Sequence, residues 1–337
     1  MSGASVVGIA DKDSQPGTGA GKRIAVLEGG ASLERSVSLR SGARVQGALR
    51  RLGHEVTAID VGPELVQRLR TERPDAAFIA LHGSGGEDGT IQELLEALDV
   101  PYTGSATAAC MRCTDKVLAK HLLHAAGIPT PDFRSLREAS IKELGAGAAR
   151  EDIEAALGFP LVVKPARGGS ALGVKFAHSS AELPGAIVGA LSYDDKALIE
   201  RYVDGRDLAV SVLDGPTPGA APLALPVVEA IPREENFYNY ESRYEIGMTT
   251  FICPAELPAE VTARAQQLAL ATYELLGCHG VARVDLMLAR DSGELAVLET
   301  NVGPGLTETS LLPLAADAAG IGFDALVARI LTSAWTR

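Results

Sequence analysis

The apolar positions in the first third of the chain follow two alternating patterns. Short apolar runs that end in glycine or polar residues are typical of buried strands leading into loops. The segments between them carry apolar residues at helical spacing, and the first of these ends at Gly53. The strand-like runs are 23–30, 54–61 and 75–81, and the helix-like segments are 33–53, 64–73 and 91–98. This alternation predicts an α/β domain over residues 23–115, built on a parallel sheet with right-handed crossovers.

A second unit begins with a predicted helix over 114–129, which Gly127 and Pro129 end. The polar, tyrosine-rich segment 229–247 has no clear period, and a loop of that length in a compact enzyme is usually functional or disordered. Two strand pairs are expected within 159–177 and 197–215, a helix over 258–276, strands over 280–288 and 294–302, and helices over 310–320 and 324–335. The first pair encloses a Gly/Ser loop and the second a turn at Asp204–Gly205.

Composition narrows the class of protein. The chain has 337 residues, 46% of them hydrophobic, and a formal net charge of -12, which argues against broad nucleic-acid or anionic-membrane binding. No apolar run approaches transmembrane length, and residues 1–22 lack the apolar segment of a signal peptide, so we expect a disordered extension on a cytoplasmic protein. Cys110 and Cys113 form a lone C-x-x-C without further metal ligands at a suitable spacing, which favours ordinary buried thiols.

Carboxylates interrupt the two apolar strands near the C-terminus. Glu299 and Asn301 are two residues apart, so they point to one face of a strand, and Asp285 can join them if the two strands pair. Two carboxylates and an amide oxygen suit Mg²⁺ rather than zinc and leave room for substrate phosphates. A solvated hairpin face is the alternative, but apolar residues surround the acids on both sides.

A lysine precedes the Gly/Ser loop of "VVKPARGGSALGV". Such a loop lets backbone N–H groups approach phosphate oxygens while Lys164 supplies a charge, although the order of residues is not that of a Walker A motif. Lys116, at the start of a helix, strengthens this interpretation over a plain hairpin turn. Glu200, after an apolar strand, and Asp207, after a turn, suit an adenine amino group and ribose hydroxyls, although a hairpin alone also explains them.

Glu34 and His82 lie just beyond predicted strand ends, where ligands meet a parallel sheet. The glycine-rich turn "HGSGGEDG" suits close approach to a small polar ligand. A connection that caps the next helix explains Asp88 and Gly89 equally well, but it does not explain His82.

Together these stretches resemble D-alanine–D-alanine ligase, a family of the ATP-grasp superfamily, along almost all of residues 23–335. The resemblance rests on "LEGGASLERSVSLRSG", "ALHGSGGEDGTIQ", "PYTGS", "TDKVLAK", "VVKPARGGSALGV", "ALIERYV", "FYNYESRY", "FICPA", "GVARVDLML" and "LETNVGPGLTETSLLP". It implies an α/β ATP-grasp fold with three domains, 23–115, 116–205 and 206–337, in which ATP lies between the second and third. It also implies a mobile ω-loop over 229–247, a homodimer, and Mg²⁺ as two ions, with Mn²⁺ as a substitute.

The implied reaction makes D-alanyl-D-alanine for peptidoglycan: ATP phosphorylates one D-alanine, and the amine of a second attacks the acyl phosphate. The resemblance assigns Arg283 to charge stabilisation on the reacting group and Ser310 to the carboxylate of the second D-alanine. It assigns Glu34, with His82 beside it, to the ammonium group of the first D-alanine. Glu34, Ser170 and Tyr244 match a hydrogen-bonded trio over the site, and Arg243, Gly305 and Leu311 complete the substrate set. The matched ATP contacts are Lys116, Lys164, Ser170, Glu200, Arg201, Val203, Asp207, Phe237 and Met287, and the matched metal ligands are Asp285, Glu299 and Asn301.

The sequence departs from the family pattern at positions near the substrates. Arg243 stands in place of the usual lysine, Val302 follows the metal asparagine, and Thr300 replaces an aliphatic residue. Glu93 follows "GTIQ" where a small residue is usual, and Glu308 places an acid two residues before Ser310. These changes leave open a paralogue that joins other amino acids. A non-catalytic ATP-binding regulator would have lost the metal and charge-stabilising residues, and those are present.

Overall fold

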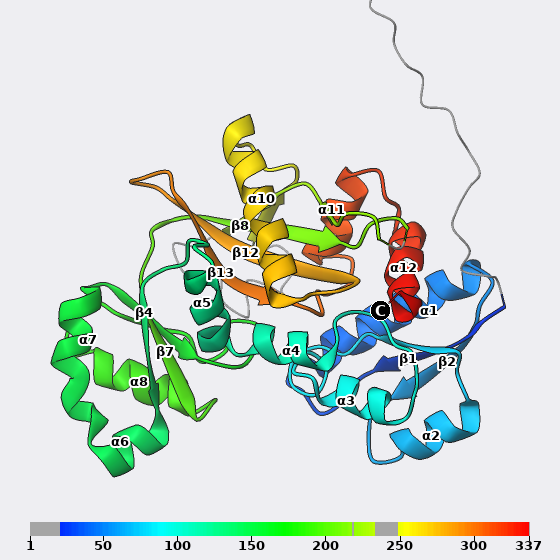
Figure 1. The fold of residues 1–337 in the computed structure, drawn as a ribbon, viewed down its shortest axis with the longest axis horizontal. Helices are drawn as coiled ribbons and strands as arrows, with labels where there is room; N and C mark the ends of the chain where they lie inside the picture. The colour runs from blue at the N-terminus through cyan, green and yellow to red at the C-terminus, as the bar shows by residue number, and fades with distance from the viewer. Residues whose placement is uncertain (1–20, 218, 233–248, 337) are drawn as a thin grey trace, which may run out of the picture.

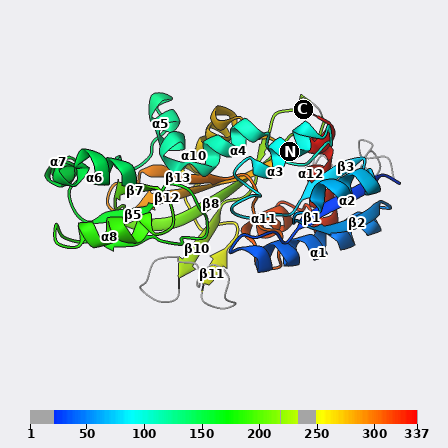
Figure 2. The ribbon, with the colours of Figure 1, turned by 90° about the horizontal axis from the view of Figure 1, so that it is seen from below.

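The computed structural model describes residues 21–217, 219–232 and 249–336, and it contains three sheets arranged along the molecule. Figure 1 shows an N-terminal unit in blue and cyan, a central unit in green, and a C-terminal unit in yellow to red. Seen from below in Figure 2, the sheet of the C-terminal unit lies between the other two units.

The N-terminal unit contains the predicted parallel sheet. Its strands are β1 (Arg23–Glu28), β2 (Glu55–Asp60) and β3 (Ala76–Ile79), in the order β2-β1-β3. The helices are α1 (Arg35–Arg51), α2 (Leu65–Glu72), α3 (Thr90–Ala97) and α4 (Thr107–Thr114). Alternate residues of β1 pack on opposite faces, with Val26 in one apolar core and Leu27 in another. The α/β prediction for this part of the chain is confirmed, and α4 is an additional helix that the apolar pattern did not reveal.

The central unit is an antiparallel sheet covered by helices. Its strands, in the order β4-β7-β5-β6, are β4 (Phe133–Arg137), β5 (Leu161–Pro165), β6 (Lys175–Ala177) and β7 (Lys196–Arg201). The helices are α6 (Glu138–Leu144), α7 (Arg150–Leu157) and α8 (Leu183–Leu191), with the 3-10 turn η1 (Ala146–Ala149) between α6 and α7. Leu161, Val163 and Ile199 of the sheet form a separate core with α7 and α8. The predicted pairing around the Gly/Ser loop is present as β5 and β6.

The C-terminal unit has a larger sheet in the order β11-β10-β8-β12-β13, with β9 paired to β8. Its strands are β8 (Gly205–Leu213), β9 (Leu223–Ala224), β10 (Val228–Pro232), β11 (Thr249–Ile252), β12 (Val281–Ala289) and β13 (Leu295–Asn301). Its helices are α10 (Ala259–Leu276), α11 (Leu311–Ala318) and α12 (Phe323–Thr332), and the 3-10 turn η2 (Ser333–Trp335) follows α12. Val210 and Val212 of β8 pack in the core under α10, while Ala209 and Leu213 pack in the core with α11 and α12. That second core also contains Val26 of the N-terminal sheet, so the N-terminal and C-terminal units share it.

Helix α5 (Lys116–Ala125) follows α4 directly, contacts α4 and α10, and contributes Leu123 to the core under α10. Figure 1 shows it beside the C-terminal sheet, at the junction with the central unit. Its first residue is therefore placed where all three units meet.

The prediction of a loop over 229–247 was wrong for the first residues of that segment. Residues 228–232 form β10, which pairs with both β8 and β11. Glu229 makes this stretch look polar, but its carboxylate accepts hydrogen bonds from Arg206 Nε (2.6 Å) and Nη2 (2.5 Å) on the neighbouring strand β8. The rest of the predicted segment, 233–247, lies outside the described residues.

Within the described ranges, no single helix is long and apolar enough to cross a membrane. One consecutive pair, Leu311–Ala318 with Phe323–Trp335, meets the length and composition required only when taken together, and it is bent by 108°.

Candidate active site

A cavity of about 710 Å³ lies where the three units meet. Glu34 and His82 line it from the N-terminal unit, and the loop after β5 contributes Ser170. Arg283 and Ser310 line it from the C-terminal unit. A smaller cavity of about 80 Å³ between the central and C-terminal sheets is lined by the predicted ATP and metal residues Lys116, Lys164, Asp207, Asp285 and Glu299. The predicted substrate, ATP and metal residues named here, which are far apart in the sequence, therefore line two neighbouring cavities.

The carboxylates of β12 and β13 meet as the sequence predicted. The two strands are antiparallel, with Asp285 opposite Glu299 and Arg283 opposite Asn301. Arg283 donates to Asp285 from Nε (2.6 Å) and Nη2 (2.8 Å), and Lys116 Nζ lies 3.4 Å from Glu299 Oε2. The Asn301 side-chain oxygen accepts a hydrogen bond from the backbone N–H of Gly303 (2.8 Å), which fixes the start of the turn.

The donor set fits a magnesium ion. Among the described residues, no group of three or more His, Cys, Asp or Glu side chains is placed to hold a metal. Asp285 and Glu299, with the amide oxygen of Asn301 two positions along β13, offer only hard oxygen ligands from adjacent strands. Mg²⁺ is commonly held by one or two carboxylates and completed by water and substrate phosphates, so this small set is sufficient.

Glu34 and Ser170 come from different units but touch. Glu34 immediately precedes α1, is buried, and accepts a hydrogen bond from the Ser170 hydroxyl. Gly169 lies so close that a Cβ there would be 3.2 Å from Glu34 Oε2, and Ser170 itself has φ +54°, a conformation that non-glycine residues rarely adopt. Two members of the predicted trio are therefore brought together by a strained loop, while Tyr244, like Arg243 and Phe237, lies outside the described residues.

His82 joins the N-terminal unit to the turn after β13. Its Nδ1 lies 2.9 Å from the carbonyl oxygen of Gly303, which can only accept, so Nδ1 carries a proton. Its Nε2 lies 2.9 Å from the Ser41 hydroxyl, which also accepts from the backbone N–H of Leu306 (3.2 Å). Sequence reasoning found His82 but missed Ser41, because a serine inside a helix carries no visible signal.

Glu87 adds a largely buried carboxylate to the same corner, with 15% of its side chain exposed and Oε1 3.5 Å from His82 Nδ1. Burial raises the pKa of Glu87, and the hydrogen bond and charge of His82 act in the opposite direction. Glu87 and His82 both line the larger cavity, so this corner presents a His–carboxylate pair to the cavity.

Some of the predicted nucleotide residues line or adjoin the smaller cavity, and the others lie away from it. Lys116 Nζ donates to the backbone oxygen of Gly168 (2.5 Å), and Asp207 lies opposite Met287 on paired strands. Lys116, Lys164 and Asp207 line the smaller cavity, and Met287 is buried beside them. Glu200 lies behind Lys164, with only 3% of its surface exposed, and is held between Lys164 and Lys120. Arg201 is exposed and pairs with Asp132 (3.4 Å), while Val203 is half-buried in the connection to β8.

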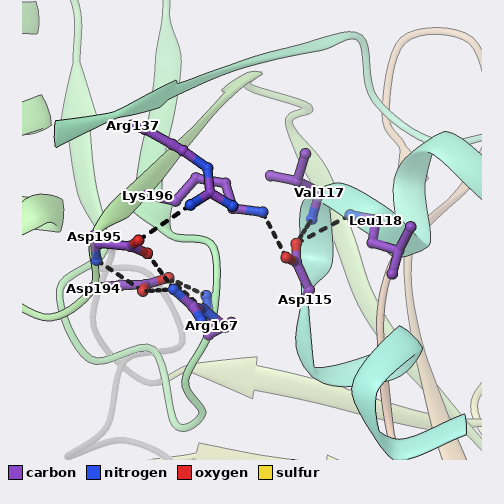
Figure 3. A network of polar contacts seen from close by, with 8 residues as sticks. All are labelled: Asp115, Val117, Leu118, Arg137, Arg167, Asp194, Asp195 and Lys196. Atoms are coloured by element: carbon purple, nitrogen blue, oxygen red, sulfur yellow. Dashed lines mark hydrogen bonds and ion pairs between the residues drawn. The ribbon is translucent and has the colours of Figure 1, made fainter. Parts of the chain in front are cut away.

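An ionic network ties the Gly/Ser loop to the start of α5 (Figure 3). Arg167 opens the loop, and its backbone N–H (2.8 Å) and Nη2 (2.7 Å) donate to Asp194, while Nη2 also contacts Asp195. Lys196, two residues after Asp194, donates from Nζ to Asp115 Oδ2 (2.5 Å). Asp115 in turn caps α5, accepting from the N–H groups of Val117 and Leu118 (both 3.1 Å). Sequence reasoning missed this network, because its members are far apart in the chain.

Ser310 precedes α11, and its hydroxyl accepts from the Thr307 N–H (3.1 Å). A Cβ at Gly305 would lie 2.6 Å from Ser310 Oγ, so glycine is required for this approach. Leu311 follows and lines both cavities. Glu308, which the sequence placed near this subsite, does not line either cavity: it is exposed and pairs with Arg44 Nε (3.3 Å).

The remaining unusual positions lie under the site. Val302 packs with Cys113 and Ala119, Thr300 is buried, and both line the larger cavity. Glu93 is exposed on α3 and lines neither cavity. Cys110 and Cys113 are both buried thiols, as predicted.

Family models for the D-ala D-ala ligase N-terminus and the D-ala D-ala ligase C-terminus match residues 64–105 and 122–332. The chain is 44% identical over 316 residues to a D-alanine–D-alanine ligase of Syntrophotalea carbinolica, covering 94% of this chain and 97% of the relative. The chain belongs to the D-alanine–D-alanine ligase family. Membership confirms the resemblance seen in the motifs and makes the protein an ATP-dependent ligase.

Solved structures of the family share the fold. The Bacillus anthracis D-alanine–D-alanine ligase is 35% identical and aligns with a TM-score of 0.80, covering 93% of this chain and 97% of that one. The same ligase complexed with ATP is 34% identical over the same shares, with a TM-score of 0.76. The VanG D-Ala:D-Ser ligase of Enterococcus faecalis is 27% identical, with a TM-score of 0.78, covering 93% of this chain and 99% of that one. The chain has the predicted ATP-grasp fold.

Proposed function

We propose that the protein joins two D-alanine molecules into D-alanyl-D-alanine, at the cost of one ATP, for peptidoglycan precursor synthesis. The observation that carries this is the shared cavity, in which Glu34, Arg283 and Ser310 face one space beside the smaller cavity that Lys164 and Asp285 line. A carboxylate for an ammonium group, a cation for the reacting centre and a helix start for a carboxylate are the groups that two amino acids need.

The reaction runs in two steps. A carboxylate oxygen of the first D-alanine attacks the γ-phosphorus of ATP, and ADP leaves. The amine of the second D-alanine then attacks the acyl carbon, loses a proton, and expels phosphate. Arg283 offsets negative charge on the acyl phosphate and on the tetrahedral intermediate, because it lines the cavity and Asp285 fixes its guanidinium.

In this proposal Glu34 binds the ammonium group of the first D-alanine, with His82 beside it. Ser310 and the start of α11 bind the carboxylate of the second, with Gly305 and Leu311 at the same wall. Ser170 connects the Gly/Ser loop to Glu34, so loop position and substrate position are linked through one hydrogen bond. Tyr244 and Arg243 belong to the proposed ω-loop, which would exclude water from the acyl phosphate.

For the nucleotide, we propose that Lys116 and Lys164 bind the phosphates and that Asp207 binds the ribose. Glu200, Arg201, Val203, Phe237 and Met287 form the proposed adenine side. Asp285, Glu299 and Asn301 would hold Mg²⁺ as two ions, with Mn²⁺ able to substitute, and the metal would supply positive charge to the phosphates. On the same family grounds we propose that the protein is cytoplasmic and forms a homodimer. Light scattering on the purified protein would test the oligomeric state.

The second candidate is a ligase for D-alanine and another amino acid. It is supported by the departures at Val302 and Thr300, close to the proposed second-substrate subsite, and by the similarity to a D-Ala:D-Ser ligase. Phosphate release measured with ATP, Mg²⁺ and D-alanine, against a panel of other amino acids, separates the two candidates. Absence of D-alanine-dependent release would overturn the primary proposal, and faster release with D-alanine plus another amino acid would favour the second.

A further inference from the structure

Lys120 on α5 is a buried charged residue that the proposed reaction does not use. None of its surface is exposed, although lysine is almost never fully buried unless it is paired. Its ammonium nitrogen lies 2.5 Å from Glu200 Oε1 and 2.5 Å from the Thr130 hydroxyl, and 5.4 Å from the ring centre of Phe133. Thr130 in turn donates to the backbone oxygen of Val297 on β13 (2.8 Å). Helix α5, β4, β7 and β13 therefore all hold this amine in one place.

Glu200 is shared between two lysines. Its Oε1 faces Lys120, and its Oε2 forms an ion pair with Lys164. Burial alone would raise the pKa of Glu200, but the charges and hydrogen bonds of the two lysines outweigh burial and lower it. The carboxylate is therefore ionised at neutral pH. Burial lowers the pKa of the Lys120 ammonium group, while the charge and the hydrogen bond of Glu200 act in the opposite direction. With both lysines protonated, the three side chains together carry one positive charge in excess.

The two lysines differ in what else they can reach. Lys164 is the penultimate residue of β5, lines the smaller cavity, and keeps 12% of its side chain exposed. Lys120 lines neither cavity. A buried carboxylate without a counter-charge is strongly unfavourable, so with only one lysine present Glu200 would hold that lysine for itself.

We propose that Lys120 is a positioning residue of the nucleotide site: it shares the charge of Glu200 with Lys164, so that Lys164, although it also pairs with Glu200, retains positive charge in excess for the phosphates of ATP. This inference rests on the proposed role of Lys164. In this cluster Lys120 offsets the charge of Glu200, and Lys164 provides the positive charge in excess to the ligand. The same arrangement stiffens the junction of α5 with the central sheet.

The test measures dissociation constants of Mg·ATP and of adenosine, by displacement of a fluorescent ATP analogue, for the wild-type protein and Lys120→Met. Methionine keeps an unbranched side chain, one heavy atom shorter than that of lysine, and removes its charge. We expect ATP to bind about tenfold more weakly or worse, because Lys164 becomes committed to Glu200, while adenosine, which has no phosphates, binds as before. Equal losses for ATP and adenosine, or no loss for ATP, would overturn the proposal.

A double-mutant comparison separates this role from general damage to the fold. Removing both charges in Lys120→Met/Glu200→Gln leaves no unpaired buried acid, so ATP affinity should equal that of Glu200→Gln alone. A further loss in the double variant would contradict the inference, and this comparison remains available if Lys120→Met alone fails to fold. The control is Lys142→Met, which removes a lysine from an exposed pair with Glu138 on α6 and should change neither affinity.

These measurements need no amino-acid substrate. If D-alanine supports no phosphate release, the proposed function fails while the ATP measurements still decide the role of Lys120. If the D-alanine reaction is present and Lys120→Met binds ATP normally, only the inference about Lys120 fails.

Discussion

Arg283 donates two hydrogen bonds to Asp285, from Nε at 2.6 Å and from Nη2 at 2.8 Å, and both residues belong to β12. A charge-stabilising group and a metal ligand are thus fixed as one unit. We expect Arg283→Ala to lower kcat by about 10²-fold or more, because the arginine acts on charge that develops during the reaction.

The same variant should bind Mg·ATP with an affinity close to that of the wild type, since the metal ligands and both lysines remain. Steady-state phosphate release gives kcat, and nucleotide displacement gives the affinity. Unchanged turnover would remove Arg283 from the reacting centre, and loss of ATP binding would show that its main role is to hold Asp285.

Glu299 lies opposite Asp285 and 3.4 Å from Lys116. Glu299→Gln keeps the size of the side chain but removes one of the two carboxylate charges offered to Mg²⁺. We expect the Mg²⁺ concentration for half-maximal activity to rise about tenfold or more, because metal affinity depends on ligand charge. Glu294→Gln, an exposed residue that precedes β13, is the matched control and should leave the Mg²⁺ titration unchanged. Identical titrations for both variants would argue against a metal at this site.

Ser310 is the proposed partner of the second carboxylate. Ser310→Ala removes a hydroxyl that also accepts from the N–H of Thr307 (3.1 Å), so we expect the KM for the second D-alanine to rise about tenfold with a smaller change in the KM for ATP. Initial rates over a wide range of D-alanine concentrations separate the two amino-acid sites. A change confined to the first site would reverse the assignment of the two subsites.

Glu308 offers a test with the opposite expectation. The acid is exposed, pairs with Arg44 at 3.3 Å, and does not line either cavity. Glu308→Ser should therefore leave the preference among second amino acids within about twofold of the wild type, because exposed ion pairs contribute little. The check is phosphate release across the amino-acid panel, and a new preferred substrate would show that the charge acts on the subsite through Arg44 or Leu306.

Asp115 connects pH to stability. Burial would raise its pKa, but the hydrogen bond from Lys196, the backbone N–H groups at the start of α5 and the charge of Lys196 outweigh burial and lower the pKa below its ordinary value of 3.8. A carboxylate with a lowered pKa in the folded state stabilises the fold above the ordinary value, and this contribution disappears as pH falls through the lowered one. Asp115→Ala should cost about 1–2 kcal/mol at pH 7, mainly through the lost helix cap.

The difference between wild type and Asp115→Ala in thermal unfolding should therefore be constant from pH 7 down to about pH 5 and shrink below pH 4. Asp132→Ala, which removes an exposed partner of Arg201, is the control. A difference that grows toward acid pH would contradict the assignment.

The sequence predicted the parts of the site that depend on period and order. Glu299 and Asn301 could be placed on one face because strand side chains alternate, and pairing with Asp285 needed only two adjacent apolar strands. The parallel N-terminal sheet followed from alternating strands and helices in the same way.

Contacts between distant segments could not be predicted in this way. His82 forms hydrogen bonds with Ser41 and Gly303, and Arg167 forms one with Asp194. In each case the local sequence around one residue does not indicate which distant residue it contacts. Glu229 misled the loop prediction for the same reason, because its pairing with Arg206 is visible only after the strands are aligned. Glu308 looked functional from its spacing, and only the direction of its side chain removed it from the cavity.

One apolar core contains Val26 and Val45 of the N-terminal unit together with Leu312 and Val327 of the C-terminal unit, whereas the core that holds Leu161 and Ile199 draws only on the central unit. Counted by cores rather than by sheets, the first and last thirds of the chain form one packing unit that the central segment interrupts. Residues 23–115 expressed alone would therefore expose apolar residues of this shared core, whereas the central segment keeps the core of Leu161 and Ile199 within itself and depends on α5 only for the cover of Leu198 and Ala166.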